Sequence, residues 1–478
     1  MKGTKMELTQ TSITRRNLLR GATATALLLP FGLSLASCAA PSGGGGGNAG
    51  PAGEVTSDNP FGVAANTEVD AVIFDGGYGI DYVENAAKIM EGSSGLEGVT
   101  IKVSPSTKIA TELQPRFVGG NPPDLVDNSG ANSIGWNTIL DQLEDLTEVL
   151  DTENLEGEKI RDTLYDGVEA PGTFGDKFAA LNYVFTTYGI WYSGSLFEAN
   201  GWSVPETWQD LKDLGAAAKE KGKYLFLWGK EAATYYQTFV MDSAIIQGGD
   251  TVRLALENLE EGCWSQPEIQ DILTILHDLI QSGYVKPGGS GTQFTEAQAQ
   301  WSLNQEALLY PSGSWIENEM KDQTADDFQM KGVREFPLDA NATTPAGYMR
   351  AEAGEPFIVP SNAKNPAGGK ELLRTMLSKE AATAFSKEKL APTIVKGIVP
   401  DDGFGSTALV SQVEMIEAAG SGMFTVKFYN LYGMNGDQLP IWNSFLDGKL
   451  SVEQITKQLQ DLTDAVRNDD SIEKIEIK

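Results

Sequence analysis

Two short segments of this chain concentrate side chains that can hydrogen-bond an uncharged polar ligand. Residues 75–78 and residues 127–132 each follow an apolar stretch, and both carry carboxylate, hydroxyl or amide groups beside glycine. Such groups donate to and accept from the hydroxyls of a neutral, hydroxyl-rich molecule such as a sugar. Ordinary solvated turns, which also favour glycine and asparagine, remain an equal alternative at each position. The candidate ligand-binding residues in these segments are Asp75, Tyr78, Asn128 and Asn132.

The sequence lacks the residues that most catalytic and metal sites require. His277 is the sole histidine, and it lies within the apolar pattern of an expected helix, so a structural role is favoured. With no second histidine and no CxxC pattern, the sequence argues against structural zinc and against Ser-His or Cys-His catalysis. The glycines at 76, 77 and 79 match neither GxxxxGK(S/T) nor GxGxxG, which argues against a nucleotide site. We therefore expect no cofactor, no metal and no enzymatic activity.

A secreted glycoside hydrolase is the rival from another class of function, because two carboxylates can flank a scissile glycosidic bond. Acidic pairs such as Asp401-Asp402 could play that part. The chain contains 66 aspartates and glutamates, however, so that such pairs are expected on any solvated face. A receptor for peptides or metal ions is a third alternative, which the scarcity of histidine and the wealth of aromatic residues disfavour.

Aromatic side chains provide flat surfaces on which a ligand ring can stack. Trp228 stands at the end of a strand expected at 224–228, beside Gly229. Such a tryptophan either stacks on a sugar ring or covers the core, and the sequence leaves both interpretations open. Phe428 and Tyr432 belong to a later aromatic stretch, in which core packing is the favoured interpretation.

The elements that must position these residues alternate between strand and helix. Strands are expected at 69–74, 99–103 and 124–126, with helices at 80–90 and 107–118 between them. This order predicts an α/β fold with a mostly parallel sheet, whose ligands lie beyond the carboxyl ends of the strands. Both polar segments described above follow such ends.

A longer stretch, from 180 to 192, is rich in β-branched and aromatic residues and predicts an extended strand. Residues 193–195 offer capping hydroxyls to a short helix, which Asn200-Gly201 ends. Thr207 and Asp210 form a variant capping box for an amphipathic helix that Gly222 ends.

The beginning of the chain has the pattern of an export signal. Arg15-Arg16 precedes an uncharged apolar run at 22–35, which is too short for a comfortable membrane span, and Leu35-Ala36-Ser37-Cys38 follows. We predict a signal peptide over 1–37 with a twin-arginine motif and a lipobox, so that Cys38 is lipidated. An ordinary signal peptide, or a retained helix with a chance cysteine, is the alternative. Residues 38–60 are rich in glycine and small residues and predict a flexible tether.

The charge of the chain limits its partners. The formal net charge is −30, and residues 1–37 carry +4 (five lysines and arginines, one glutamate), so their removal leaves −34. Such an acidic surface repels nucleic acid and anionic lipid, so we expect no nucleic-acid partner and membrane contact through the lipid anchor only. Once Cys38 is lipidated, Cys263 has no intrachain partner, and stability must come from a large core divided between two domains.

Several segments, taken in order, resemble the sugar-binding proteins of bacterial ABC importers. They are the strand and helix that lead into Gly201-Trp202 and Pro205-Glu206-Thr207-Trp208, the run from Trp301 to Trp315 that ends in Gly-x-Trp, and Gly354 to Pro360. Four segments are most similar to the actinobacterial lipoproteins that bind N-acetylglucosamine and N,N′-diacetylchitobiose, namely 59–82, 113–127, 181–194 and 313–320.

The resemblance implies a two-lobed fold of the type II periplasmic-binding-protein class, in which each lobe is a mostly parallel sheet flanked by helices and the ligand cleft lies between the lobes. The first lobe would comprise 61–185 and 354–400. The second would comprise 186–353 and 401–478, which include the C-terminal helices. Closure about strands near 181–190 and 352–358 would trap a mono- or oligosaccharide, and the membrane subunits of an ABC permease would recognise the loaded form. The location would be extracytoplasmic, at the cell membrane, through Cys38.

The resemblance also implies site residues. Trp315 is expected as a sugar platform in the cleft, against the alternative of a core tryptophan. Arg350 and Glu352 are expected to hydrogen-bond the ligand, and an Arg–Glu pair that braces the hinge is an equal alternative.

Overall fold

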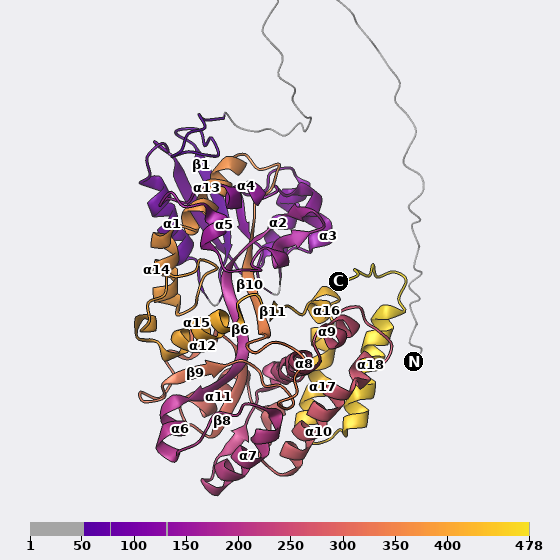
Figure 1. Ribbon diagram of the computed structural model, residues 1–478. Coiled ribbons are helices and arrows are strands. Elements are labelled where there is room, and N and C mark those ends of the chain that lie inside the picture. Colours follow the sequence, from indigo (N-terminus) through magenta and orange to yellow (C-terminus); the bar gives the residue numbers. More distant parts are fainter. Residues whose placement is uncertain (1–51, 77, 131, 478) are drawn as a thin grey trace, which may run out of the picture. The chain divides into compact units, whose positions relative to one another are not determined.

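The computed structural model of the protein describes residues 52–76, 78–130 and 132–477 (Figure 1). The expected signal peptide, Cys38 and the tether up to residue 51 lie outside the described residues. Within the described ranges, no helix combines the length and the apolar character that crossing a membrane requires.

Nine of the strands in the described part of the chain form one mixed sheet in the order β2-β1-β3-β10-β6-β8-β7, with β11 beside β10 and β9 beside β6. Pairing is parallel at both ends of this order, where β1 pairs with β2 and β3, and β7 pairs with β8. It is antiparallel in the middle, where β10 pairs with β3 and β6. The strands are β1 (Glu68–Phe74), β2 (Thr100–Ser106), β3 (Leu125–Asp127), β6 (Leu181–Ser193), β7 (Tyr224–Phe226), β8 (Ala307–Gly313), β9 (Met330–Val333), β10 (Met349–Ile358) and β11 (Met423–Phe424).

Strand β6 is the longest element of the sheet and links its two ends. Its 13 residues span about 40 Å when extended. The first half pairs with β10, from Leu181 to Thr187, and the second half pairs with β8 and β9, from Tyr188 to Ser193. Eleven of its residues are buried, as its β-branched and aromatic composition predicts. The predicted strand at 180–192 is therefore confirmed, and Figure 1 shows β6 and β10 running between the two groups of helices.

Helices pack on β1, β2 and β3 at one end of the sheet. Helix α1 contacts β2, α13 and α14, and α13 contacts β1, β3 and α4. The predicted strand and helix order in this part of the chain is confirmed with shifts of one to three residues at the boundaries. The helices of this group are α1 (Asp81–Glu91), α2 (Ile109–Val118), α3 (Trp136–Ile139), α4 (Thr147–Asp151), α5 (Ile160–Thr163), α13 (Pro366–Met376) and α14 (Lys379–Lys389); a separate hairpin pairs β4 (Thr173–Phe174) with β5 (Lys177–Phe178).

A second group of helices surrounds β6, β7, β8 and β9. Helix α8 contacts β8, α9, α10 and α17, while α7 packs on β7 and α15 packs on β9. These helices are α6 (Gly194–Asn200), α7 (Leu211–Glu220), α8 (Thr234–Gly248), α9 (Asp250–Glu257), α10 (Pro267–Gln281), α11 (Phe294–Ser302), α12 (Ile316–Met320), α15 (Thr407–Ala419), α16 (Phe428–Leu431), α17 (Asn435–Leu446) and α18 (Val452–Arg467).

The predicted helix caps are present. The Ser193 hydroxyl accepts a hydrogen bond from the Leu196 amide at 3.1 Å, and Gly201 ends α6 in the left-handed conformation with φ of +65°. Thr207 and Asp210 form the predicted capping box at the start of the short helix that continues into α7. These local signals therefore fix where the segment after β6 begins and ends its helices.

Separate hydrophobic clusters fill the two ends of the sheet. One draws on residues between 63 and 185 and between 349 and 419, around Tyr82, Tyr183 and Phe357. Another draws on residues between 190 and 336 and between 424 and 459, around Trp208 and Phe239. Helix α15 contributes to more than one cluster, because Met415 and Ile416 belong to the first and Ala408 packs in a third with Trp191 and Trp301.

Part of the expected tether is folded. Gly53 donates its amide to the Gly62 carbonyl at 2.8 Å, and the Asn59 side chain makes two hydrogen bonds with the backbone of Val63. Asn59 is 4% exposed. The folded body therefore begins before Phe61. The composition predicts that it begins at Phe61.

The positions of His277 and Cys263 are typical of residues with a structural role. His277 sits on α10, partly buried, with its ring centroid 6.0 Å from that of Phe445. Cys263 is a free, buried cysteine, and burial raises the pKa of its thiol to about 12. A thiol of that kind stays protonated and unreactive at neutral pH.

Candidate ligand-binding site

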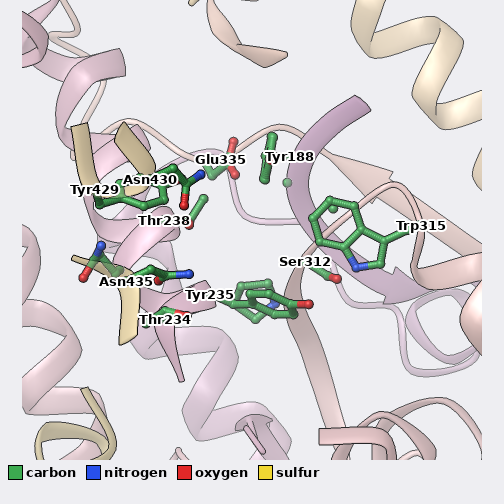
Figure 2. Close-up of a pocket in the computed structure, with 14 residues that line it drawn as sticks. Tyr188, Thr234, Tyr235, Thr238, Ser312, Trp315, Glu335, Tyr429, Asn430 and Asn435 are labelled. Carbon is green, nitrogen blue, oxygen red and sulfur yellow. The ribbon is translucent and has the colours of Figure 1, made fainter. Parts of the chain in front are cut away.

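A cavity of about 150 Å³ lies where β6, β8 and the start of α8 meet the segments around α16 and β9. Figure 2 shows Trp315 at one end of it and Asn430 and Asn435 at the other, with Tyr188 and Tyr235 between them. The cavity is lined by Tyr188, Gly189, Thr234, Tyr235, Gln237, Thr238, Pro311, Ser312, Gly313, Trp315, Glu335, Tyr429, Asn430 and Asn435. Aromatic rings and uncharged polar groups thus dominate its wall, as they do in sites for neutral polar ligands.

Each part of this wall has a clear origin in the fold. Tyr188 stands in the middle of β6, where the pairing of that strand passes from β10 to β8. Thr234, Tyr235 and Thr238 come from the first turns of α8, and positions 234 and 238 share one helix face because they are four residues apart. Trp315 follows the end of β8 directly, at the start of α12.

Trp315 is held by its neighbours with part of its ring left exposed to the cavity. The Ser314 amide donates to the Thr187 carbonyl at 2.9 Å, which ties the turn before α12 to β6. The Trp315 ring packs edge-on against Tyr188, at 5.7 Å and 85°, and against Tyr235, at 6.1 Å and 60°. Edge contacts of this kind fix the ring while a face stays available for stacking. The structure therefore brings the predicted platform residue into the cavity.

We expect Gly313→Ala to weaken ligand binding by displacing the Trp315 ring. A Cβ at position 313 would stand 2.0 Å from the Trp315 ring, so the ring must move out of its present position. We expect a loss of about tenfold in affinity, equal to ~1.4 kcal/mol. Titration of the variant with sugar would measure it, beside Gly436→Ala, where a Cβ meets nothing within 4 Å. Unchanged affinity in Gly313→Ala would show that the ring position does not matter.

Arg350 and Glu352 lie directly behind the cavity wall. The Arg350 guanidinium carbon is 4.0 Å from the centre of the Tyr188 ring and 5.7 Å from that of Tyr429. Glu352 accepts hydrogen bonds from the Tyr188 hydroxyl and from Arg350, both at 3.1 Å. Arg350 is completely buried, so it supports the two tyrosines that line the cavity by cation–π contact and does not itself line it. The direct contacts of Glu352 with the ligand, and a bracing role of the pair, both stay predictions.

Two further buried carboxyl groups interact electrostatically with the same guanidinium. Asp242 lies 3.8 Å from Arg350, on α8, and Glu335 lies in the segment after β9; both are buried. Burial raises the pKa of Asp242 to about 7, with Arg350 opposing the shift and Glu352 adding to it. Burial also raises the pKa of Glu335 well above its usual range, and Asp242 adds to that shift. Desolvation is the dominant cause in both cases, because a charged carboxylate loses its hydration there.

The end of the cavity opposite Trp315 carries amide groups. Asn430 and Asn435 are exposed and project from α16 and the start of α17, as Figure 2 shows. Gln237 is different, because its amide oxygen accepts from the Trp442 indole at 2.6 Å and its nitrogen donates to Gln438 at 2.7 Å. Asn430 and Asn435 therefore offer donors and acceptors to a ligand, whereas Gln237 positions α8 against α17.

Three of the predicted site residues are engaged elsewhere in the structure. The Asn128 amide donates to and accepts from the backbone of Ile134, which closes the loop after β3. Asn132 accepts from the amide and the hydroxyl of Thr111 and so stabilises the start of α2. Trp228 is 2% exposed, with its ring against the backbone of Gly289 and its indole nitrogen 3.4 Å from the Asn443 side chain. None of the three lines the cavity, and of the two interpretations of Trp228 its burial matches the core one.

Asp75 and Tyr78 lie on the segment between β1 and α1. Asp75 is exposed and its amide donates to the Ser106 carbonyl at 3.0 Å, so it closes the end of the β1–β2 pair. The Tyr78 hydroxyl is buried and has no hydrogen-bond partner among the described residues. Burial raises its pKa, and the charges of Glu355 and Glu319 raise it further. The Tyr78 ring packs on Phe385 of α14, with the ring centroids 5.4 Å apart, and neither Tyr78 nor Asp75 lines the cavity.

The sequence did not single out most of the cavity wall. Tyr188 is predicted only as part of the strand at 180–192, and neither Tyr235 nor Glu335 carries a local signal of ligand binding. Tyr429 and Asn430 fall within the aromatic stretch of the sequence that contains Phe428 and Tyr432. Phe428 itself is a core residue. The lining residues that the sequence does not predict as site residues are Tyr188, Thr234, Tyr235, Thr238, Glu335, Tyr429, Asn430 and Asn435.

Comparison with known proteins identifies relatives along the whole chain. The model of the family "bacterial extracellular solute-binding protein" matches residues 97–383. The diacetylchitobiose binding protein NgcE of Streptomyces coelicolor is 56% identical over 467 residues, which cover 98% of this chain and 98% of that protein. A multiple sugar-binding protein of Streptococcus mutans is 20% identical over 307 residues, covering 63% of this chain and 70% of that one.

Solved structures share the fold at low sequence identity. A chitin oligosaccharide binding protein superposes with a TM-score of 0.62 and 16% identity, covering 84% of this chain and 98% of that one. The solute-binding protein RafE in complex with raffinose gives a TM-score of 0.61 and 17% identity, covering 83% and 100%. The predicted fold class, an α/β protein of the type II periplasmic sugar-binding class, is thereby confirmed.

Proposed function

The chain belongs to the family of bacterial extracellular solute-binding proteins, and we propose that it captures N-acetylglucosamine or N,N′-diacetylchitobiose for an ABC importer. Members of this family bind solutes without transforming them, and they are located outside the cytoplasm. The choice of sugar is supported by the diacetylchitobiose binding protein, which is 56% identical over nearly the full length of both chains.

One structural observation carries the proposal, namely the cavity with an indole at one end and free amides at the other. A pyranose presents an apolar face of C–H groups, which packs on the exposed part of the Trp315 ring. An acetamido group presents one N–H donor and one carbonyl acceptor, which the side chains of Asn430 and Asn435 can pair. The exposed indole and the uncharged donors and acceptors together suit a neutral N-acetylated sugar better than an ion.

We infer that the ligand is held between two lobes that close upon it. The first lobe would be 61–185 with 354–400, and the second 186–353 with 401–478, so that β6 and β10 connect them. The cavity of about 150 Å³ is smaller than the roughly 300–1,000 Å³ of typical small-molecule sites, so a disaccharide needs additional room. Tyr78, whose buried hydroxyl has no hydrogen-bond partner among the described residues, would supply a wall from the first lobe. Asp75, Asn128 and Asn132 would then support the loops around it.

A titration of the purified protein with a panel of chito-, malto-, xylo- and cello-oligosaccharides tests the proposal. A disaccharide of about 29 heavy atoms at ~0.3 kcal/mol each gives about −9 kcal/mol, a dissociation constant near or below micromolar. We expect chitobiose to bind in that range and to be recovered unchanged. No binding to any sugar in the panel would overturn the proposal, and release of monosaccharide would point to a hydrolase.

We further propose that Cys38 is lipidated and anchors the protein to the cell membrane, where permease subunits receive the sugar. Cys38→Ser is expected to move the protein from the membrane fraction to the medium or soluble fraction, because the acyl chains are lost. Blotting of fractions, with Cys263→Ser as the matched control, would measure it. Retention of Cys38→Ser in the membrane fraction would contradict the anchor.

A further inference from the structure

Two carboxyl groups lie within ion-pair distance of one guanidinium behind the cavity wall, and a third interacts with them electrostatically. Arg350 contacts Glu352 at 3.1 Å and Asp242 at 3.8 Å, and the charges of Asp242 and Arg350 both act on the buried carboxyl group of Glu335. The guanidinium also makes cation–π contacts with the rings of Tyr188 and Tyr429. Arg350, Asp242 and Glu335 are each no more than 1% exposed. This group, Asp242, Glu335, Arg350 and Glu352, is called the acid cluster below.

The charges of the acid cluster do not balance when every group is ionised. Glu352 is 21% exposed and takes hydrogen bonds from Arg350 and from the Tyr188 hydroxyl, so it pairs with the single positive charge. Asp242 and Glu335 would then add two uncompensated negative charges to a buried site. Such a state is strongly unfavourable, because neither ion keeps its hydration. The cluster therefore retains a proton on its acids at neutral pH, as close carboxyl pairs do.

Glu335 is the member of the acid cluster that reaches the cavity. It is among the residues that line the cavity, and Figure 2 draws it with the others. Its Oε2 atom is buried and has no hydrogen-bond partner among the described residues, and both side-chain oxygens of Asp242 lack one too. A carboxyl group beside a cavity that the protein leaves partly unpaired can pair with a ligand that enters the cavity.

We propose that Glu335 contacts the sugar as a neutral carboxylic acid, donating a hydrogen bond from its carboxyl group to a sugar oxygen, with Asp242 acting as the positioning residue that keeps the proton there. The inference rests on the proposed function and deepens it. Binding then stabilises the protonated form of Glu335. A neutral sugar carries no titrating group, so a change of affinity with pH comes from the protein.

The surroundings of Glu335 support the neutral form. Burial raises its pKa and Asp242 on α8 raises it further, while Arg350 on β10 and Arg334 on the adjoining position lower it. Glu352 on β10 raises the pKa of Asp242 and faces the same guanidinium. Tyr188 on β6 and Tyr429 on α16 are held neutral, because burial raises the pKa of each hydroxyl. The groups that favour a proton on Glu335 therefore outweigh the two arginines.

The sign of the pH dependence follows from this arrangement. Below the pKa of Glu335 the donor is present and affinity is constant. Above it, binding must first restore a proton, so affinity falls by about tenfold per pH unit. A carboxylate that merely accepted hydrogen bonds from sugar hydroxyls would give the opposite slope.

Calorimetric titration with N,N′-diacetylchitobiose from about pH 5.5 to about pH 9.5, in buffers of different ionisation enthalpy, tests this inference on the wild-type protein. We expect affinity to fall at the alkaline end and about one proton to be taken up per sugar bound there. Binding that is independent of pH, that strengthens with pH, or that takes up no proton would overturn it.

Variants assign the effect to its residues. Glu335→Gln keeps a donor that cannot titrate, so its affinity should change by less than about twofold over the same range. Asp242→Asn removes the neighbouring charge, so the alkaline fall should move down by about one pH unit or more. Glu371→Gln is the matched control, because Glu371 is fully buried on α13, pairs with Arg374 at 2.6 Å and lies outside the cavity.

The pH profile of the Glu371→Gln control should follow that of the wild type. A Glu335→Gln profile that keeps the wild-type slope would overturn the inference. Failure of the wild type to bind chitobiose at any pH would instead refute the proposed function, so the two failures are distinguishable.

Discussion

Replacement of Arg350 with methionine is expected to lower the free energy of unfolding at neutral pH by about 3–5 kcal/mol, the cost of leaving a buried charge without its partner. Arg350 is fully buried and is the cation that faces Asp242, Glu335 and Glu352. Methionine restores much of the volume, so the loss reports charge compensation and the contacts with Tyr188 and Tyr429. Urea unfolding followed by tryptophan fluorescence would measure it.

The loss in Arg350→Met should be smaller near pH 5.5 than near pH 8. Asp242 has a pKa of 3.8 when unperturbed and about 7 in the folded protein, so its contribution to stability is fully present below the unfolded value and is lost as pH rises through about 7. Without Arg350 the folded pKa rises further, because Arg350 lowers it in the wild type. Lys379→Met, which breaks an exposed ion pair with Glu158, should show no measurable change. Equal losses in both variants, or a loss independent of pH, would contradict this account.

Replacement of Trp315 with alanine is expected to weaken chitobiose binding by about 30-fold or more, equal to ~2 kcal/mol or above, because tryptophans that anchor a ligand carry losses of this size. The Trp315 ring is the aromatic surface at one end of the cavity, fixed edge-on by Tyr188 and Tyr235. Its indole is partly exposed, so truncation should cost little stability. Titration calorimetry and thermal unfolding of the same sample would separate the two effects.

Trp228→Phe is the matched control for Trp315→Ala. Trp228 is 2% exposed, in the cluster around Trp208, so its replacement should lower the melting temperature and leave the sugar affinity unchanged. If Trp228→Phe lost affinity and Trp315→Ala kept it, the assignment of the platform would be reversed.

The helix starts and ends could be predicted from the sequence because each capping motif lies within a few consecutive residues. The Ser193 cap, the left-handed Gly201 and the Thr207–Asp210 capping box needed only their neighbours, and all three are present. Strand β6 was predicted from composition alone, and its burial along the whole length explains why that composition is so apolar. The type II class required the resemblance to a family, since both parallel ends of the sheet are joined through antiparallel strands that local patterns do not specify.

The candidate site could be predicted only in part, because its wall comes from segments far apart in the chain. Residues 188, 235, 315, 335 and 430 meet only after β6, α8, β8, β9 and α16 have packed together. Polar loops at strand ends gave the prediction of Asn128 and Asn132, yet those amides satisfy their own loops and the start of α2. Hydrogen-bonding groups of the same kind serve a loop or a ligand equally well, and only the fold decides between them.

Arg350 and Glu352 show the limit of pair recognition. Their proximity in sequence indicated a pair, and the structure places them 3.1 Å apart. The other two acids, Asp242 and Glu335, lie about a hundred residues and about fifteen residues before Arg350, on different elements. No sequence spacing relates Asp242 and Glu335 to Arg350. The unbalanced charge behind the cavity can therefore be recognised only from the folded structure.

The most direct measurement is a crystal structure of the protein grown with N,N′-diacetylchitobiose. The account predicts one sugar ring stacked on Trp315, with an acetamido group within hydrogen-bond distance of Asn430 or Asn435 and a sugar oxygen beside the carboxyl group of Glu335. A disaccharide bound elsewhere, for instance at the groove beside Trp208 and Lys212, with the Trp315 cavity unoccupied, would contradict it.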